Sequence, residues 1–318
     1  MSATTQAAVA SILHERDRDE LRAIFGDDVR FDQALAPFTS WKIGGPADAF
    51  ISVGVRGRMA ELMRFCLRRR MPWFVLGSGS NLLVGDGGMR GIVMRLGGEF
   101  AEIEAAAVGD TVIVHAGASA NMALLTAKAA SLGAIGVGSL AGIPGSVGGS
   151  LRMNAGTDRE IGDFVREVWV QSPGKPEPYA VGIEYFYRHT TLARDAVVSR
   201  VTLAFERGDP KTVREEIQAR LVRRKATQPI AQPNAGSCFR NPDGDKAARL
   251  IEAAGLKGLR EGGAEVSPLH ANFINNVDDA SAADVATLLA RVRRAVREKF
   301  GVQLQLEVHL VGVFIEKG

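Results

Sequence analysis

The sequence lacks several features that would place it in a special class of proteins. Only two of its 318 residues are cysteine, too few for a disulfide framework or a metal cluster, so we expect no metal and a reducing, cytoplasmic compartment. No apolar run reaches the roughly 18 to 20 residues of a membrane span. The first twenty residues become charged too early for a secretory signal. The net charge of +3 gives no indication of nucleic acid as a partner.

Glycine, by contrast, is abundant. The chain has 36 glycines, about 11% against a typical share of about 7%. Eight lie within residues 77–98 and eight within residues 133–156. Such clustering is expected where the backbone takes a positive φ or closely approaches another group. No fixed period is present, and proline is not frequent, so collagen-like and low-complexity chains are excluded.

The hydrophobic pattern predicts mixed helices and strands without a regular βαβ rhythm, which favours an α+β fold. Beyond a loose tail over the first ten residues, we expect helices over 11–25, 211–225, 245–254 and from Ser281 to Gly301, and one more that carries Met59, Leu62, Met63 and Cys66 at helical spacing. Ser119 is expected to cap a helix that ends at Gly133. Expected strands cover residues 49–53, 72–76, 91–96, 111–116, 167–171, 196–205 and the alternating segment 302–310.

Two glycine-rich loops are candidate ligand sites. The first, Gly77-Ser-Gly-Ser-Asn81, follows a predicted strand, and the second runs from Gly138 to Gly149 and leads to Met153-Asn-Ala-Gly156. Small residues let backbone N–H groups converge on an anion. The first loop matches neither a Rossmann nor a Walker motif. Two such loops suit a diphosphate cofactor, although tight turns remain the alternative at each one.

A set of motifs gives these loops a more specific meaning. In order, they are Thr39-Ser-Trp-Lys-Ile-Gly-Gly-Pro-Ala-Asp48, Leu76–Leu83, Gly142–Gly149 with Met153–Gly156, Tyr187-Arg188, Ala235–Pro242, Val266–Phe273 and Leu306-Glu307. In this order the chain resembles the UDP-N-acetylenolpyruvoylglucosamine reductase family of peptidoglycan precursor synthesis. It resembles the shorter type, because no tyrosine or room for an extra substrate-covering loop lies between Glu206 and Ala235.

The resemblance implies three domains, two of them forming an FAD-binding unit of the vanillyl-alcohol-oxidase (PCMH) type. The implied division is a tail and the start of the first helix over 1–20, FAD-binding domain 1 over 21–98, FAD-binding domain 2 over 99–208, and a substrate-binding domain over 209–318. FAD would lie between the first two domains, with its pyrophosphate against the glycine loops. The chain would act as a monomer on small molecules.

The resemblance also implies the reaction. NADPH reduces FAD, hydride passes to the enolpyruvyl β-carbon, the enzyme protonates the α-carbon, and UDP-N-acetylmuramate results. Ser237 matches the proton donor, and Arg188 and Glu307 match the catalytic arginine and glutamate. The planar guanidinium of an arginine can make two hydrogen bonds to a carboxylate at once. Thr190 stands where the family usually has serine, which keeps the hydroxyl.

The remaining implied site residues hold ligands. Lys225, Asn241 and His270 are the candidates for substrate binding, although a solvated helix end and a satisfied buried histidine are ordinary alternatives for Lys225 and His270. Those for the cofactor are Ile43, Gly44, Gly45, Gly77, Ser78, Gly79, Ser80, Asn81, Leu82, Gly142, Ile143, Pro144, Gly145, Ser146, Gly148, Gly149, Asn154, Ala155 and Gly156.

Two other functions remain open. Another FAD oxidoreductase of the same architecture, such as a sugar or alcohol oxidase, would explain the glycine loops but not the three catalytic matches. A non-catalytic nucleotide-binding module would be indicated by loss of those residues, and all three are present. Cys238, beside Ser237, is expected to be a small buried hydrophobe rather than a nucleophile.

Overall fold

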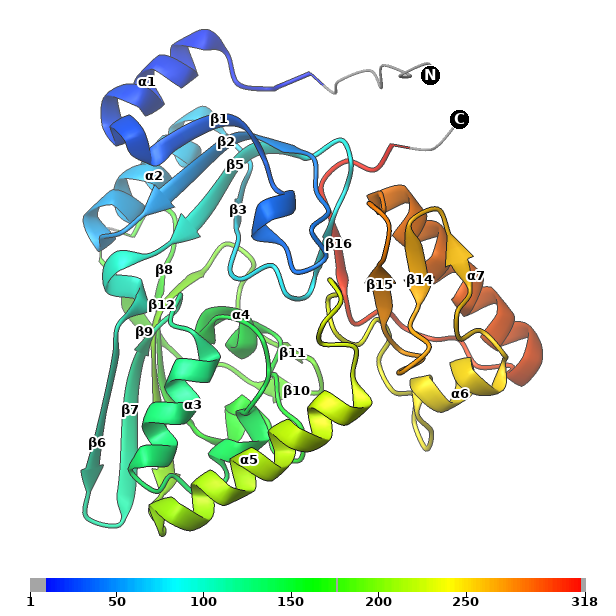
Figure 1. Ribbon diagram of the computed structural model, residues 1–318. Helices are drawn as coiled ribbons and strands as arrows, with labels where there is room; N and C mark the ends of the chain where they lie inside the picture. The colour runs from blue at the N-terminus through cyan, green and yellow to red at the C-terminus, as the bar shows by residue number, and fades with distance from the viewer. Residues whose placement is uncertain (1–9, 176, 316–318) are drawn as a thin grey trace. The chain divides into compact units, whose positions relative to one another are not determined.

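The computed structural model describes residues 10–175 and 177–315 (Figure 1). These belong to two compact units, the first built from Met1–Ile51, Gly79–Val93 and Gln228–Gly318, the second from Ser52–Ser78 and Met94–Thr227. Apart from Ala10, the expected N-terminal tail lies outside the described residues. The three-domain division stays a prediction.

The first unit contains both helices and strands. Its elements are α1 (Glu15–Phe25), β1 (Val29–Ala34), the start of β2 (Pro46–Val53), β4 (Leu82–Val84), the start of β5 (Met89–Leu96), α6 (Ala247–Ala253), β13 (Arg260–Glu261), β14 (Ala264–Val266), β15 (Ile274–Asn276), α7 (Ala282–Phe300) and β16 (His309–Val311). Strand β1 pairs antiparallel with β2.

Helix α7 covers the small sheet β13-β14-β15, beside α6 (Figure 1). The predicted capping box is confirmed: Ser281 Oγ accepts the amide of Asp284, and the Asp284 carboxylate accepts the amide of Ser281. Gly301 ends the helix at φ 70°, a left-handed conformation that glycine adopts without strain. One face of α7 supplies the core of this region, including Val285, Leu288 and Val292.

The predicted strand over residues 302–310 is wrong in extent. Leu304 and Val308 of the expected apolar face are buried, but Leu310 is exposed, and only Leu306 forms an isolated bridge, to Phe239, before β16 begins at His309. Strand β16 then runs parallel to β4. Alternation reports which side chains are buried, and it does not supply the neighbouring strand that a ladder needs.

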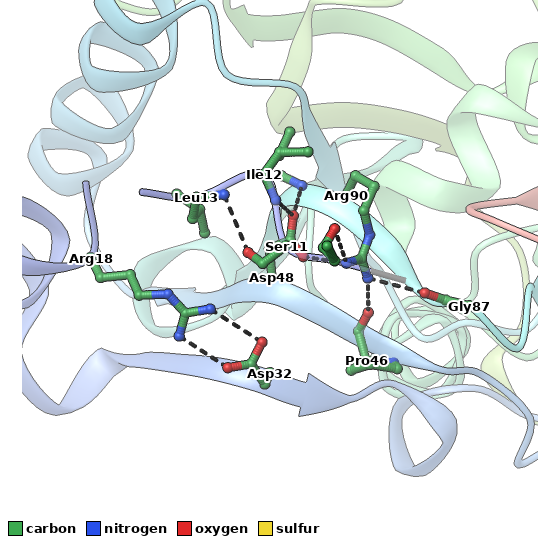
Figure 2. Close-up of polar contacts among 11 residues, drawn as sticks. Ser11, Ile12, Leu13, Arg18, Asp32, Pro46, Asp48, Gly87 and Arg90 are labelled. Carbon is green, nitrogen blue, oxygen red and sulfur yellow. Dashed lines mark hydrogen bonds and ion pairs between the residues drawn. The ribbon is translucent and has the colours of Figure 1, made fainter. Parts of the chain in front are cut away.

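A buried carboxylate ties together three segments of the first unit (Figure 2). Asp48, 1% exposed, accepts the amides of Ile12 and Gly91 at 3.2 and 2.8 Å, and its Oδ1 lies 2.7 Å from Arg90 Nη1. Arg90 also donates to the carbonyls of Pro46 and Gly87. Because Asp48 is fully engaged inside the protein, its place in the Thr39–Asp48 motif has a structural explanation.

The second unit is built around an antiparallel sheet. Its elements are α2 (Arg56–Arg69), β3 (Trp73–Val75), β6 (Ile103–Val108), β7 (Thr111–Gly117), α3 (Met122–Ser131), α4 (Val147–Arg152), β8 (Val165–Gln171), β9 (Tyr179–Val181), β10 (Tyr185–Phe186), β11 (His189–Thr190), β12 (Val197–Glu206) and α5 (Pro210–Thr227). Five strands form the sheet in the order β6-β7-β12-β8-β9, and β10 and β11 form a separate hairpin.

Helices α3 and α5 of this unit lie side by side, with α3 against β7 (Figure 1). The expected helix before Gly133 exists, but Asn121 caps it instead of Ser119, its Oδ1 accepting the amides of Ala123 and Leu124. Asp209 begins α5 as predicted and accepts the amide of Thr212 at 2.8 Å. Helix α5 continues unbroken to Thr227. The mixture of antiparallel sheets and separate helices confirms the α+β prediction.

Candidate functional site

Arg188 lies in the turn of the β10–β11 hairpin in the second unit, with φ 62°, an uncommon conformation for a residue other than glycine. Its Nη1 donates to Glu160 Oε1 at 3.1 Å and its Nη2 to the carbonyl of Gly156 at 3.2 Å. The guanidinium also lies 4.6 Å from the centre of the Tyr187 ring, a cation–π distance. Three contacts therefore hold a side chain that is 17% exposed.

Glu160 and Asn154 complete this cluster. The second Glu160 oxygen accepts Asn154 Nδ2, which also donates to the carbonyl of Phe186 at 3.0 Å. Asn154 Oδ1 accepts the amide of Gly162. Burial raises the pKa of Glu160, partly offset by the Arg188 charge. The sequence prediction missed Glu160, because only the fold brings it to Arg188.

Ser237 lies in the first unit, after a turn shaped by Asn234. Asn234 Oδ1 accepts the amide of Gly236 at 2.9 Å, and Gly236 has φ 76°, which a residue with a Cβ rarely adopts. Ser237 is half-buried. Within residues 10–175 and 177–315, its hydroxyl makes no hydrogen bond. The turn thus presents a hydroxyl that is available to a ligand.

The first unit also brings the Glu307 backbone next to Ser237. The amide of Glu307 donates to the carbonyl of Cys238 at 2.8 Å, and Asn81 Nδ2 donates to the carbonyl of Glu307 at 3.1 Å. Arg240, two residues after Cys238, has a buried Nε without a hydrogen-bond partner in the described part of the chain. Two of the three predicted catalytic residues therefore occupy adjoining segments, while Arg188 belongs to the second unit.

Asn272 supports the Ser237 segment from below the surface. Its carbonyl accepts the amide of Cys238, and its side chain bonds both main-chain groups of Phe239. The amide of Asn272 donates to His270 Nδ1 at 3.3 Å, which places the proton of a neutral ring on Nε2. Burial lowers the pKa of His270. His270 is thus a neutral, half-buried donor.

The two glycine loops pack differently from one another. In the second unit, the amides of Val147 and Gly148 donate to the carbonyls of Ala120 and Ala118, so residues 118–122 and 145–148 run side by side. A Cβ at Gly77 would lie 2.7 Å from Ser146 Oγ, so only glycine fits there without a shift.

In the first unit, a Cβ at Gly79 would lie 2.3 Å from the carbonyl of Phe38, and one at Gly45 would lie 2.1 Å from that of Asp86. Thr39 Oγ1 accepts the amide of Ile43 and donates to its carbonyl. These two glycines are therefore required by close packing of one backbone on another. The sequence alone could not separate this cause from a bound ligand.

Lys225 and Asn241 are both exposed. Asn241 Oδ1 accepts the amide of Ala247 and so caps α6. Arg224, the neighbour of Lys225, lies beside the second loop together with Leu221: a Cβ at Gly142 would lie 3.2 Å from Arg224 Nη1 and 3.0 Å from Leu221 Cδ2. Burial lowers the pKa of Arg224. Arg223, Arg224 and Lys225 are consecutive in the sequence, and which of them faces the loop depends on the rotation of α5.

Both cysteines are buried and unpaired. Burial raises the pKa of each thiol to about 12. The expectation that Cys238 is a buried hydrophobe is confirmed by its 0% exposure. None of the helices in the described ranges has the length and apolar character needed to cross a bilayer.

Two family models match the chain. The C-terminal domain of UDP-N-acetylenolpyruvoylglucosamine reductase matches residues 228–311, and an FAD binding domain matches residues 47–171. A UDP-N-acetylenolpyruvoylglucosamine reductase of Symbiobacterium thermophilum is 44% identical over 92% of this chain and 96% of that protein. One from Anaeromyxobacter dehalogenans is 41% identical over 94% of this chain and 91% of its own length.

A solved structure gives the same result. The UDP-N-acetylenolpyruvylglucosamine reductase of Thermus caldophilus superposes with a TM-score of 0.76 at 33% identity, covering 89% of this chain and 99% of that one. The resemblance inferred from the sequence motifs is thereby confirmed.

Proposed function

The chain belongs to the UDP-N-acetylenolpyruvoylglucosamine reductase family of FAD oxidoreductases, and we propose that it reduces UDP-N-acetylenolpyruvoylglucosamine to UDP-N-acetylmuramate with NADPH. The observation that carries the proposal is the 44% identity over nine-tenths of the chain, together with Arg188, Ser237 and Glu307 in their family motifs. Bound FAD supplies the hydride chemistry, from NADPH to the β-carbon of the enolpyruvyl group.

The glycine loops of the second unit fit such a cofactor. Gly145, at φ 149°, belongs to a loop paired with residues 118–122. Ser119 Oγ, in that paired segment, is buried without a partner among the described residues. A buried hydroxyl costs free energy unless it finds an acceptor, and a diphosphate oxygen is one. We assign the cofactor to these loops, including Asn154–Gly156, and to Ile43–Gly45 and Gly77–Leu82.

Arg188 is proposed to bind the carboxylate of the enolpyruvyl group and to stabilise the negative charge that develops on it. A planar guanidinium can make two parallel hydrogen bonds to a carboxylate, and charge stabilisation by oriented donors is a large contribution to catalysis. The contacts to Glu160, Gly156 and Tyr187 support this role because they fix the guanidinium plane before substrate arrives.

Ser237 is proposed to give its proton to the α-carbon. Support comes from its turn, which presents a hydroxyl without a competing bond in the described structure. A serine that gives up its proton becomes an alkoxide, which has a high free energy, so hydrogen-bond donors or an acid nearby must stabilise it. Glu307, whose backbone amide donates to the carbonyl of Cys238, is the proposed third catalytic residue. His270, with its Nε2 proton, Lys225 and Asn241 are proposed to bind the substrate.

The test is a purified holoenzyme assay that follows NADPH oxidation with and without the enolpyruvyl nucleotide under anaerobic conditions. We expect NADPH consumption to depend on the nucleotide and to match UDP-N-acetylmuramate formed. Consumption indifferent to the nucleotide would overturn the proposal. Electron transfer to O₂ from a sugar or alcohol, without NADPH, would indicate an oxidase of the same architecture instead.

The enzyme is proposed to work as a cytoplasmic monomer on small molecules, without nucleic acid. Its two buried, unpaired thiols are consistent with a reducing compartment. Light scattering during size-exclusion chromatography gives the mass directly, with 33.9 kDa plus FAD expected. Twice that mass would overturn the monomer, and fractionation of the source cells would test the compartment.

A further inference from the structure

Glu160 is bound to two residues of the second unit at once. One carboxylate oxygen accepts Arg188 Nη1 at 3.1 Å, and the other accepts Asn154 Nδ2. We propose that Glu160 is the positioning residue for Arg188, and that its ionised carboxylate is required for the step in which Arg188 acts on the substrate carboxylate. This inference rests on the proposed function.

The geometry makes Glu160 the hub of the hairpin that carries Arg188. Asn154, 2% exposed, links Glu160 to the carbonyl of Phe186, two residues before Arg188. The Glu160 carboxylate thus contacts the Arg188 side chain directly, and it is linked through Asn154 to strand β10, which precedes Arg188. Because Arg188 has a left-handed backbone, its side chain leaves the turn in a direction that this pair of contacts fixes.

Glu160 itself is held in place by its own turn. It caps the turn Ile161–Asp163, where Asp163 Oδ2 accepts the amide of Glu160 at 3.1 Å. Gly162 allows close packing, since a Cβ there would lie 2.5 Å from the Tyr185 ring. A residue held in this way by its own turn can orient its partner, whereas a mobile surface carboxylate cannot.

Charge is as important as shape at this position. The groups that face Glu160 are Arg188, from the hairpin, and Asp163, from its own turn, with Arg159 lying 3.6 Å from Asp163. Tyr185 stays neutral below pH 10, because burial raises its pKa to about 12. Burial raises the pKa of Glu160, Arg188 lowers it and Asp163 raises it, with a net increase. Protonation therefore occurs at a higher pH than for an exposed glutamate, and it removes the charge that pairs with Arg188.

The decisive variant is Glu160→Gln in the FAD-loaded enzyme, with its two half-reactions measured separately by flavin absorbance. Reduction by NADPH should stay within about twofold of the unmodified enzyme. Reoxidation of the reduced enzyme by the enolpyruvyl nucleotide should fall by about 10²-fold, the loss typical of a misplaced catalytic group. Asp32→Asn is the matched control, because it likewise neutralises the carboxylate of an arginine–carboxylate pair, the one with Arg18, and should change neither half-reaction.

A second variant moves the pKa without touching Arg188. Asp163→Asn keeps an oxygen to accept the Glu160 amide but removes a charge that raises the Glu160 pKa. The acid limb of reoxidation should shift to lower pH, while the rate on the plateau stays the same. The ¹⁵Nε resonance of Arg188 should titrate with the same limb, and in Glu160→Gln it should not.

The outcomes separate the possibilities. The positioning role is wrong if the Glu160→Gln enzyme is reoxidised as fast as the unmodified enzyme. It is also wrong if the rates of both half-reactions fall equally. An acid limb that Asp163→Asn does not move would also overturn it, and this test remains if Glu160→Gln fails to fold. If the unmodified enzyme does not react with the enolpyruvyl nucleotide, it is the proposed function that has failed, while the ¹⁵N titration still tests the pairing of Glu160 with Arg188.

Discussion

The side chain of Asn272 hydrogen-bonds both main-chain groups of Phe239, its Oδ1 accepting the amide at 3.0 Å and its Nδ2 donating to the carbonyl at 2.8 Å. The side-chain amide thereby replaces a neighbouring strand for the segment that follows Ser237. Asn272 is 4% exposed and Phe239 1% exposed. Removing the side-chain amide therefore takes away the partner of two buried main-chain groups.

We expect Asn272→Ala to destabilise the first unit strongly. Each buried group left unpaired costs about 1–3 kcal/mol, and two are left on Phe239. The measurement is urea unfolding of the holoenzyme, followed by far-UV circular dichroism. Asn241→Ala is the control, since it removes an exposed cap of α6 worth about 1 kcal/mol. An equal loss of unfolding free energy in the two variants would contradict this role of Asn272.

The buried pair Asp48–Arg90 gives a second prediction. Asp48→Asn keeps the shape of the side chain but removes the negative charge that lies 2.7 Å from Arg90 Nη1. Breaking a buried pair from one side costs about 3–5 kcal/mol, measured as the free energy of unfolding in urea. Asp32→Asn breaks the exposed pair with Arg18 and should cost at most about 1 kcal/mol. A loss for Asp48→Asn no larger than this would contradict the structural role of Asp48.

The two thiols should be unreactive in the folded enzyme. Burial raises the pKa of Cys66 and of Cys238 to about 12, so at pH 8 almost none of either thiol is the reactive thiolate. With a thiol-specific disulfide reagent, we expect both cysteines to react in denaturant and neither to react quickly in the native holoenzyme. Rapid labelling of Cys238 in the native state would contradict its burial beside Ser237.

Local signals in the sequence predicted the elements well. The capping box at Ser281, the Asp209-Pro210 start and the stop at Gly301 depend on a few neighbouring residues, and the fold does not override them. Ser119 failed as a cap because Asn121, two residues later, supplies a better-placed side-chain oxygen. The segment 302–310 failed because a ladder needs a partner strand, and only Leu306 finds one before His309.

The functional residues also divide into those that sequence motifs reveal and those that only the fold brings together. Arg188, Ser237 and Glu307 stand in ordered motifs and were recognisable from the family resemblance, although their roles stay predictions. Glu160 and Arg224 could not be recognised, because their importance arises from what they contact across the fold. The glycines were recognised as crowded positions, but Gly45 and Gly79 are crowded by backbone carbonyls of the protein itself.

Ser237→Ala separates the two halves of the proposed reaction. The Ser237 hydroxyl makes no hydrogen bond in the described structure, so its removal should leave folding and FAD reduction by NADPH unchanged. Turnover of the enolpyruvyl nucleotide should fall by about 10²–10⁴-fold, the usual contribution of a positioned acid. If hydride still reaches the β-carbon reversibly, deuterium from labelled NADPH should appear in recovered substrate rather than in product. Equal loss of both half-reactions would mean that the substitution acts on structure, and undiminished turnover would remove Ser237 as the proton donor.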